Sequence, residues 1–69
     1  MKSFIQSILF SRNKYTPLQA RNWLKKHGFK FNDLDIKPLH LRFRQKYPYK
    51  KYSYKTKRIS DGIEFIVGY

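Results

Sequence analysis

The sequence predicts a small α+β domain in which a single helix packs on a mostly antiparallel sheet, in the order β-α-β-β-β. Three observations support this fold class. One segment carries helix start and stop signals around an apolar face, and a later segment alternates apolar with basic residues. Asp61-Gly62 lies between two strand-like segments, as the turn of a β-hairpin does. We expect residues 1–69 to form one basic domain, because so short a chain rarely holds more.

The first strand and the start of the helix are predicted from local patterns. The apolar run from Phe4 to Phe10 is rich in isoleucine and phenylalanine, which is typical of a buried strand. Thr16 is the predicted N-cap, with Pro17 at the first helical position and Gln19 closing a capping box.

The predicted helix has one apolar face and a defined end. Residues at the spacing i, i+3, i+4 and i+7 form that face: Ala20, Trp23, Leu24 and His27. Gly28 can adopt the left-handed conformation that ends many helices, followed by a contact from Phe29 to Leu24. We expect Trp23 to lie near the centre of the core, and His27 to interact with the terminal carbonyl groups of the helix.

The rest of the chain is predicted to be a connector, a strand, a loop and a hairpin. Residues 29–35 are the connector, residues 39–44 alternate as a half-buried strand with one basic face, and residues 47–51 form a loop around Pro48. The hairpin strands are residues 53–59 and 63–69. A two-residue turn places Arg58 opposite Phe65, whereas a three-residue loop places it opposite Glu64, and the sequence leaves both registers open.

The positive charge of the chain is concentrated in its second half. The formal net charge is +12, and eight of the sixteen basic residues lie between Arg42 and Arg58, a stretch that contains no acid and four tyrosines. Such closely spaced cations repel one another, and a polyanion relieves this repulsion while releasing its own counterions. We therefore expect nucleic acid as the partner, with duplex DNA preferred over RNA.

The predicted nucleic-acid-binding residues are the cations of this stretch and two loop tyrosines: Arg42, Arg44, Lys46, Lys50, Lys51, Lys55, Lys57, Arg58, Tyr47 and Tyr49. Lys25 and Lys26 are expected to extend this surface. If the two basic strands are neighbours, two rows of cations about 4.8 Å apart can follow a phosphate backbone. Lys55 and Lys57 are expected on one strand face and Arg58 on the other.

The tyrosines have two interpretations. They can stack on bases, as in proteins that bind single strands, or pack within the sheet and bond to phosphates. Tyr52 and Tyr54 suit packing as strand aromatics, whereas Tyr47 and Tyr49 flank Pro48 and suit exposed contact. We expect neighbouring strands or a partner subunit to cover the rings of Tyr47 and Tyr49, so that base stacking contributes little.

Other classes of function are disfavoured. The chain has no cysteine, no histidine–carboxylate spacing typical of a metal site, no glycine-rich phosphate loop and no pairing of a nucleophile with a base. We therefore expect no enzymatic activity, no catalytic or metal site and no cofactor. No apolar run reaches the roughly 20 residues that cross a bilayer, and residues 1–10 match a signal peptide poorly. Neither membrane attachment nor secretion is expected.

Several short sequence segments together resemble a small domain of tailed-phage and large DNA-virus proteins. They are residues 4–10, Thr16-Pro17, Trp23-Leu24-Lys25-Lys26-His27-Gly28-Phe29, Leu41-Arg42-Phe43-Arg44-Gln45, residues 54–57 and the segment from Asp61 to Gly68. In phages this domain accompanies head-maturation proteins, and as a free-standing protein it resembles components of marseillevirus-like viruses. The tyrosine–lysine run at residues 47–54 is more basic than that family pattern.

The resemblance and the charge together give the expected function. It is a non-enzymatic, sequence-independent DNA-binding or DNA-condensing protein of a large DNA virus. The resemblance implies a location in the virion or in the virus factory, in the host cytoplasm or nucleus. The alternative is a structural adaptor that binds an acidic viral or capsid protein. Self-association is a further expectation, because edge strands offer a route to it.

Overall fold

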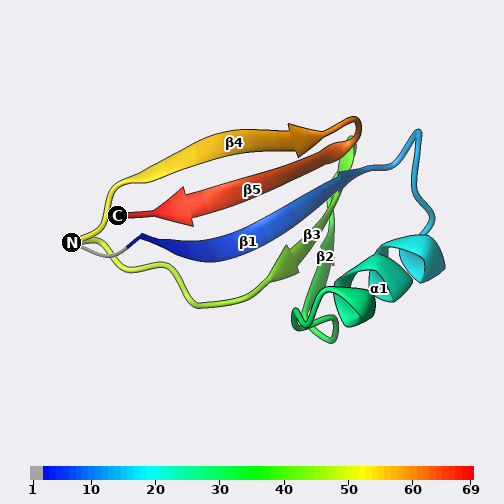
Figure 1. Cartoon of the computed structure of the whole chain (residues 1–69). Coiled ribbons are helices and arrows are strands. Elements are labelled where there is room, and N and C mark those ends of the chain that lie inside the picture. Colours follow the sequence, from blue (N-terminus) through cyan, green and yellow to red (C-terminus); the bar gives the residue numbers. More distant parts are fainter. Residues whose placement is uncertain (1–2) are drawn as a thin grey trace.

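The computed structural model describes residues 3–69 and confirms the α+β class, with one helix on an antiparallel sheet. The sheet has five strands in the order β2-β3-β1-β5-β4, so the first strand lies at its centre. In Figure 1 the helix lies beside β2, β3 and one end of β1, while most of β4 and β5 extends beyond it. The elements are β1 (Phe4–Ser11), α1 (Pro17–Lys26), β2 (Leu34–Ile36), β3 (His40–Arg44), β4 (Tyr54–Ser60) and β5 (Ile63–Gly68).

The predicted helix signals are all present. The Thr16 side chain accepts a hydrogen bond from the backbone N–H of Gln19, whose side chain accepts one from the Thr16 N–H. At the other end Gly28 has a φ of 78°, and the Phe29 N–H donates to the Leu24 carbonyl at 2.9 Å. This is the ending that the glycine predicted, and it satisfies carbonyl groups that the helix itself leaves without donors.

One strand was not predicted. Residues 34 and 35 lie in the segment expected to be a connector, but together with Ile36 they form β2 at the edge of the sheet. Leu34 pairs with Phe43 and Ile36 with Leu41, so β2 extends the apolar side of β3. The chain therefore follows the order β-α-β-β-β-β.

The β4–β5 hairpin combines the two registers that the sequence left open. Ser60 pairs with Ile63 across the two-residue Asp61-Gly62 turn, yet Arg58 pairs with Glu64. Ile59 bulges out of β4 and makes both pairings compatible, because a bulge sets two residues opposite one. Only Gly62 of the turn has a positive φ, of 85°.

The core lies between α1 and the centre of the sheet. Its fully buried apolar residues are Ile8, Phe10, Ala20, Leu24, Leu41, Phe43 and Ile63. The prediction for Trp23 was wrong: it packs against the edge of this cluster and is only partly buried. Its ring stacks on His27 at 4.0 Å between centroids and on Phe29 at 6.0 Å, so it closes the helix end of the core.

His27 lies at the carboxyl end of α1, as expected. Its Nδ1 atom is 2.8 Å from the Trp23 carbonyl oxygen. The contact fits a histidine that helps to satisfy the helix terminus.

Candidate nucleic-acid interface

Three of the four acids of the chain lie in ion pairs with lysine or arginine, and the fourth, Glu64, contacts a histidine. Asp33 contacts Arg44, Asp35 contacts Lys37, Glu64 contacts His40, and Asp61 contacts both Lys14 and Arg58. Within residues 3–69, no carboxylate pairs with the lysines of the β3–β4 loop or with those of β4. These lysines are exposed: Lys46, Lys50, Lys51, Lys55 and Lys57. The excess positive charge is therefore open to an external anion.

Two of the ion pairs change the acidity of a carboxyl group. The hydrogen bond from Lys14, together with its charge, lowers the pKa of Asp61 below its ordinary value of 3.8. The hydrogen bond from Lys37 lowers the pKa of Asp35 in the same direction. Both carboxylates therefore stay ionised at neutral pH and keep their cations engaged.

The predicted cations do not form two adjacent rows. β3 and β4 are separated by β1 and β5, so the condition under which their cations would form two adjacent rows is not met. Three strand spacings place the two strands about 14 Å apart. Arg58 lies opposite Glu64 on the sheet face that also carries Arg42, whereas Lys55 and Lys57 lie on the other face, as expected.

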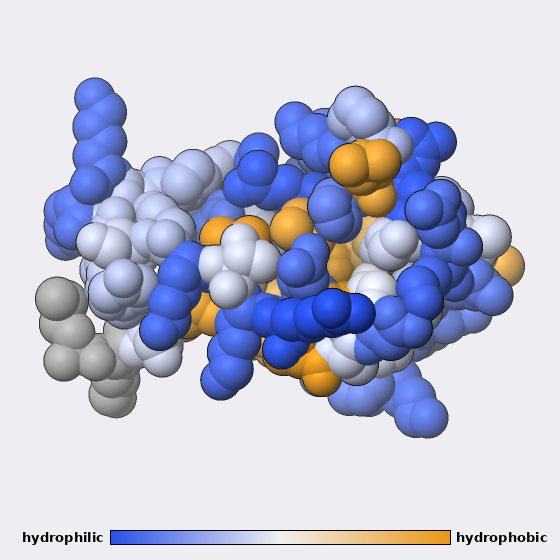
Figure 2. All heavy atoms as spheres, turned by 90° about the horizontal axis from the view of Figure 1, so that it is seen from above, coloured by the Kyte–Doolittle hydropathy of each residue, from blue (hydrophilic) through white to orange (hydrophobic). Residues whose placement is uncertain are grey.

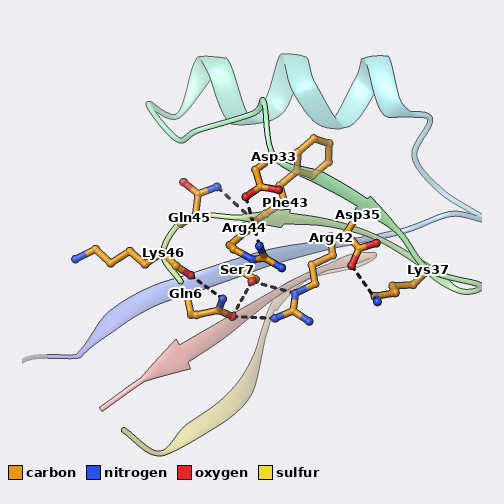
Figure 3. Close-up of polar contacts among 10 residues, drawn as sticks. All are labelled: Gln6, Ser7, Asp33, Asp35, Lys37, Arg42, Phe43, Arg44, Gln45 and Lys46. Atoms are coloured by element: carbon orange, nitrogen blue, oxygen red, sulfur yellow. Dashed lines mark hydrogen bonds and ion pairs between the residues drawn. The ribbon is translucent and has the colours of Figure 1, made fainter. Parts of the chain in front are cut away.

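The guanidinium of Arg42 is hydrogen-bonded to neighbouring side chains within the fold. Its Nε donates to the Ser7 hydroxyl and a terminal nitrogen donates to Gln6 Oε1, both at 3.1 Å. Gln6 and Ser7 are only 1% and 0% exposed, and the Ser7 hydroxyl also donates to Gln6 Oε1. Figure 3 shows these three side chains pointing toward one another below the sheet. The predicted role of Arg42 in phosphate binding is thus secondary to a buried polar network.

A bulge in β1 connects this network to the β3–β4 loop, residues 45–53. The pairing of β1 with β5 shifts at Gln6, between Ile5 and Ser7. The Gln6 carbonyl instead accepts hydrogen bonds from the backbone N–H groups of Gln45 and Lys46, at 2.7 and 3.1 Å. Its side-chain amide donates to the Lys46 carbonyl at 2.7 Å. Gln6 therefore fixes the start of the loop.

Two further side chains hold the loop in place. Gln45 accepts from the N–H of Lys30 and donates to its carbonyl, at 2.9 and 2.8 Å. The Tyr54 hydroxyl accepts from the N–H of Tyr49 at 2.7 Å and donates to its carbonyl at 3.3 Å. The predicted packing role of Tyr54 is confirmed, with the addition that it anchors the loop.

The rings of Tyr47 and Tyr49 are exposed within the chain, so the expectation that neighbouring strands cover them was wrong, whereas cover by a partner subunit stays a prediction. Their exposed fractions are 75% and 65%, so strand neighbours within the chain do not cover them. Tyr52 is packed instead, edge-on against Phe4 with 5.0 Å between ring centroids. The loop thus presents two free rings on a backbone that is fixed by hydrogen bonds.

These residues form one wall of a cleft that we call the aromatic cleft, with a volume of about 790 Å³. Four predicted residues line it: Arg44, Lys46, Tyr47 and Tyr49. The remaining lining residues were not predicted: Phe4, Lys30, Asn32, Asp33, Gln45 and Tyr52. No sequence pattern joins residues 30–33 to residues 44–52, because only the fold brings them together.

Arg44 forms part of the floor of the aromatic cleft. Its guanidinium lies 3.7 Å from Asp33 and 5.3 Å from the centre of the Tyr47 ring. Its Nε atom is buried, and no hydrogen-bond acceptor for it exists among residues 3–69. The side chain is therefore held by charge and ring contacts rather than by a closed hydrogen-bond network.

The lysines of β4 lie away from the aromatic cleft. Lys55 and Lys57 border a groove of about 570 Å³ with Phe65, Val67 and Tyr69. The strand registers place both lysines on the face of the sheet that carries the core residues Ile8 and Ile63. Lys55 lies over the Tyr69 ring at 5.3 Å. Figure 2 views the molecule from the β4 side and shows blue hydrophilic side chains spread around an orange hydrophobic strip. The cations therefore occupy more than one surface of the domain.

The described residues were also compared with the requirements of a metal site and of a membrane span. Among residues 3–69, no group of three or more histidine or acidic side chains is placed to hold a metal ion. No helix in this part of the chain is long and apolar enough to span a membrane. The comparisons with known proteins also identify no relative: no family model, no curated protein and no solved structure matches this chain.

Proposed function

We propose that this protein binds nucleic acid through its phosphate backbone, without catalysis and without sequence preference, and that duplex DNA is its main partner. The observation that carries the proposal is the distribution of charge. Three of the four acids are paired with other cations and Glu64 contacts His40, whereas five exposed lysines on the β3–β4 loop and β4 have no carboxylate partner within residues 3–69. A phosphate chain supplies the missing negative charge.

The proposal includes low sequence specificity. The single helix is buried on one face against the core and carries three exposed cations, Arg21 in its middle and Lys25 and Lys26 in its last turn. Proteins that read the major groove usually insert a helix or a β-ribbon that carries several side chains to the base edges. Contacts to phosphates fix position on the backbone without reading the sequence.

The viral setting is also part of this proposal. It rests on the resemblance of the segments Trp23–Phe29 and Leu41–Gln45 to the phage and large DNA-virus domain. In that setting the protein condenses DNA in the virion or in the virus factory, in the host cytoplasm or nucleus. Self-association is proposed at β2 or β4, since these strands form the two edges of the sheet.

A binding titration tests the partner class. Fluorescence anisotropy of labelled duplex DNA, duplex RNA and a polyglutamate peptide is measured with the full chain. We expect duplex DNAs of unrelated sequence to bind equally, and more tightly than RNA or the peptide. Tight binding of polyglutamate with none to nucleic acid would contradict the proposal and favour an adaptor for acidic proteins.

A further inference from the structure

The aromatic cleft has the dimensions and walls of a site for a flat ligand. Its volume of about 790 Å³ lies within the roughly 300–1,000 Å³ that is typical of pockets for small ligands. Its lining includes four aromatic rings from two distant parts of the chain: Phe4, Tyr47, Tyr49 and Tyr52. Aromatic rings arranged around such a space can stack on a ligand ring.

Neighbouring tyrosines hold the ring and the backbone of Tyr49 in place. Tyr52 packs edge-on against Phe4 at 5.0 Å and against Tyr49 at 6.4 Å. The Tyr54 hydroxyl holds both backbone groups of Tyr49, as described above. Because backbone groups of Lys46 and Tyr49 are already hydrogen-bonded while the rings of Tyr47 and Tyr49 remain exposed, a ligand can stack on these rings with little further ordering of the chain.

Cations surround these rings. The Lys46 ammonium lies 5.3 Å from the centre of the Phe4 ring, and Lys51 lies 5.8 Å from Tyr49 and 5.4 Å from Tyr52. Lys30 also lines the aromatic cleft, and the only carboxylate in the lining, Asp33, is already paired with Arg44. The ligand that matches this lining has a flat ring joined to a negative group.

We propose that the aromatic cleft binds one unpaired nucleotide of a DNA strand. The base stacks on Tyr47 or Tyr49, and an adjoining phosphate lies against Lys46 or Lys51. A duplex does not offer this contact, because the faces of its bases are covered by their neighbours in the stack. The inference rests on the proposed function, since the same loop lysines contact the backbone, and it adds a site for single-stranded segments.

The test compares three DNA probes of equal length, about 12 nucleotides per strand, which lies within the site sizes of small single-strand-binding folds. They are oligothymidylate, an abasic strand with the same phosphates but no bases, and a blunt duplex. The double variant Tyr47→Ala/Tyr49→Ala removes both rings. Tyr47→Phe/Tyr49→Phe keeps them, and Tyr69→Ala removes an exposed ring outside the aromatic cleft.

We expect the double alanine variant to bind oligothymidylate roughly 5- to 150-fold more weakly, the range for loss of one stacked base. Its affinity for the abasic strand and the duplex should change by less than about 2-fold, and the phenylalanine and Tyr69→Ala variants should bind oligothymidylate within about 2-fold of the unchanged protein. Thermal melting by circular dichroism should be unchanged, because both rings are exposed.

Two results would overturn the inference: equal losses on all three probes, or full retention of oligothymidylate binding by the double alanine variant. Either leaves the proposed function standing if the unchanged protein binds the duplex. If the unchanged protein binds no nucleic acid, the proposed function itself fails.

Discussion

At the scale of single residues, arginine and lysine serve different purposes in this chain. The strand arginines Arg42 and Arg44 are bound to neighbouring side chains, whereas the lysines of the loop and of β4 are exposed. The planar guanidinium can donate several hydrogen bonds at once, which suits it to a crowded polar network, whereas the ammonium of lysine is strongly hydrated. Charge counting in the sequence could not separate these roles, because it treats both cations alike.

Arg42→Ala tests the structural role of this arginine. The change removes two charged donors from the nearly buried Gln6 and Ser7, so we expect a loss of about 1–3 kcal/mol in the free energy of unfolding. Lys57→Ala, on the exposed strand β4, is the control and should change stability by less than about 0.5 kcal/mol. Urea titration followed by circular dichroism measures both. Equal stability of the two variants would show that the network contributes nothing to folding.

At the scale of elements, the sequence predicted the structure that depends on neighbouring residues and missed the structure that depends on strand pairing. The helix was predicted with its cap and its glycine ending, because each depends on residues within one turn. β2 was missed because three residues carry no usable periodicity, and its place in the sheet depends on pairing with β3. The bulges at Gln6 and Ile59 were missed for the same reason, since each is defined by the register of a partner strand.

The tip of the β4–β5 hairpin is tied to the turn that follows β1. The Ser11 N–H donates to the Gly62 carbonyl at 2.8 Å, and Lys14 pairs with Asp61. Because the pKa of Asp61 is lowered in the folded state, its ionised form stabilises the fold at pH values above its ordinary pKa of 3.8. As the pH falls through the folded pKa, the carboxylate is protonated and this contribution disappears.

The contribution of Asp61 should be visible in how the stability of the protein changes below about pH 4, the ordinary range of aspartate titration. Asp61→Asn keeps a residue that turns favour and removes the titrating group. We expect the melting temperature of the unchanged protein to fall more steeply with acidification than that of the variant, and the two curves to converge at the lowest pH. Asp35 titrates in both proteins, so the difference isolates Asp61. Parallel curves would show that the Lys14–Asp61 pair is energetically neutral.

At the scale of the whole molecule, the sequence predicted the amount of charge better than its arrangement. The net charge of +12 and the carboxylate-free stretch followed directly from residue counts. The separation of β3 from β4 did not, because strand order depends on long-range pairing around the central β1. The aromatic cleft was equally hidden, since Lys30 and Asp33 reach it only when residues 30–33 fold against the β3–β4 loop. The cations are consequently divided between the loop and the groove beside β4.

This division leads to a prediction about salt dependence. If five to seven phosphates are neutralised on duplex DNA, log K should fall linearly with log salt with a slope of roughly −4.5 to −6. Changing Lys50 and Lys51 to Gln removes loop cations, and changing Lys55 and Lys57 to Gln removes those beside the β4 groove. Each lost contact should flatten the slope by about 0.9. A duplex that spans both surfaces therefore gives similar flattening for the two pairs and an additive effect in the quadruple variant. If only one pair changes the slope, the duplex occupies that surface alone, and a slope that no variant changes would contradict phosphate binding by these lysines.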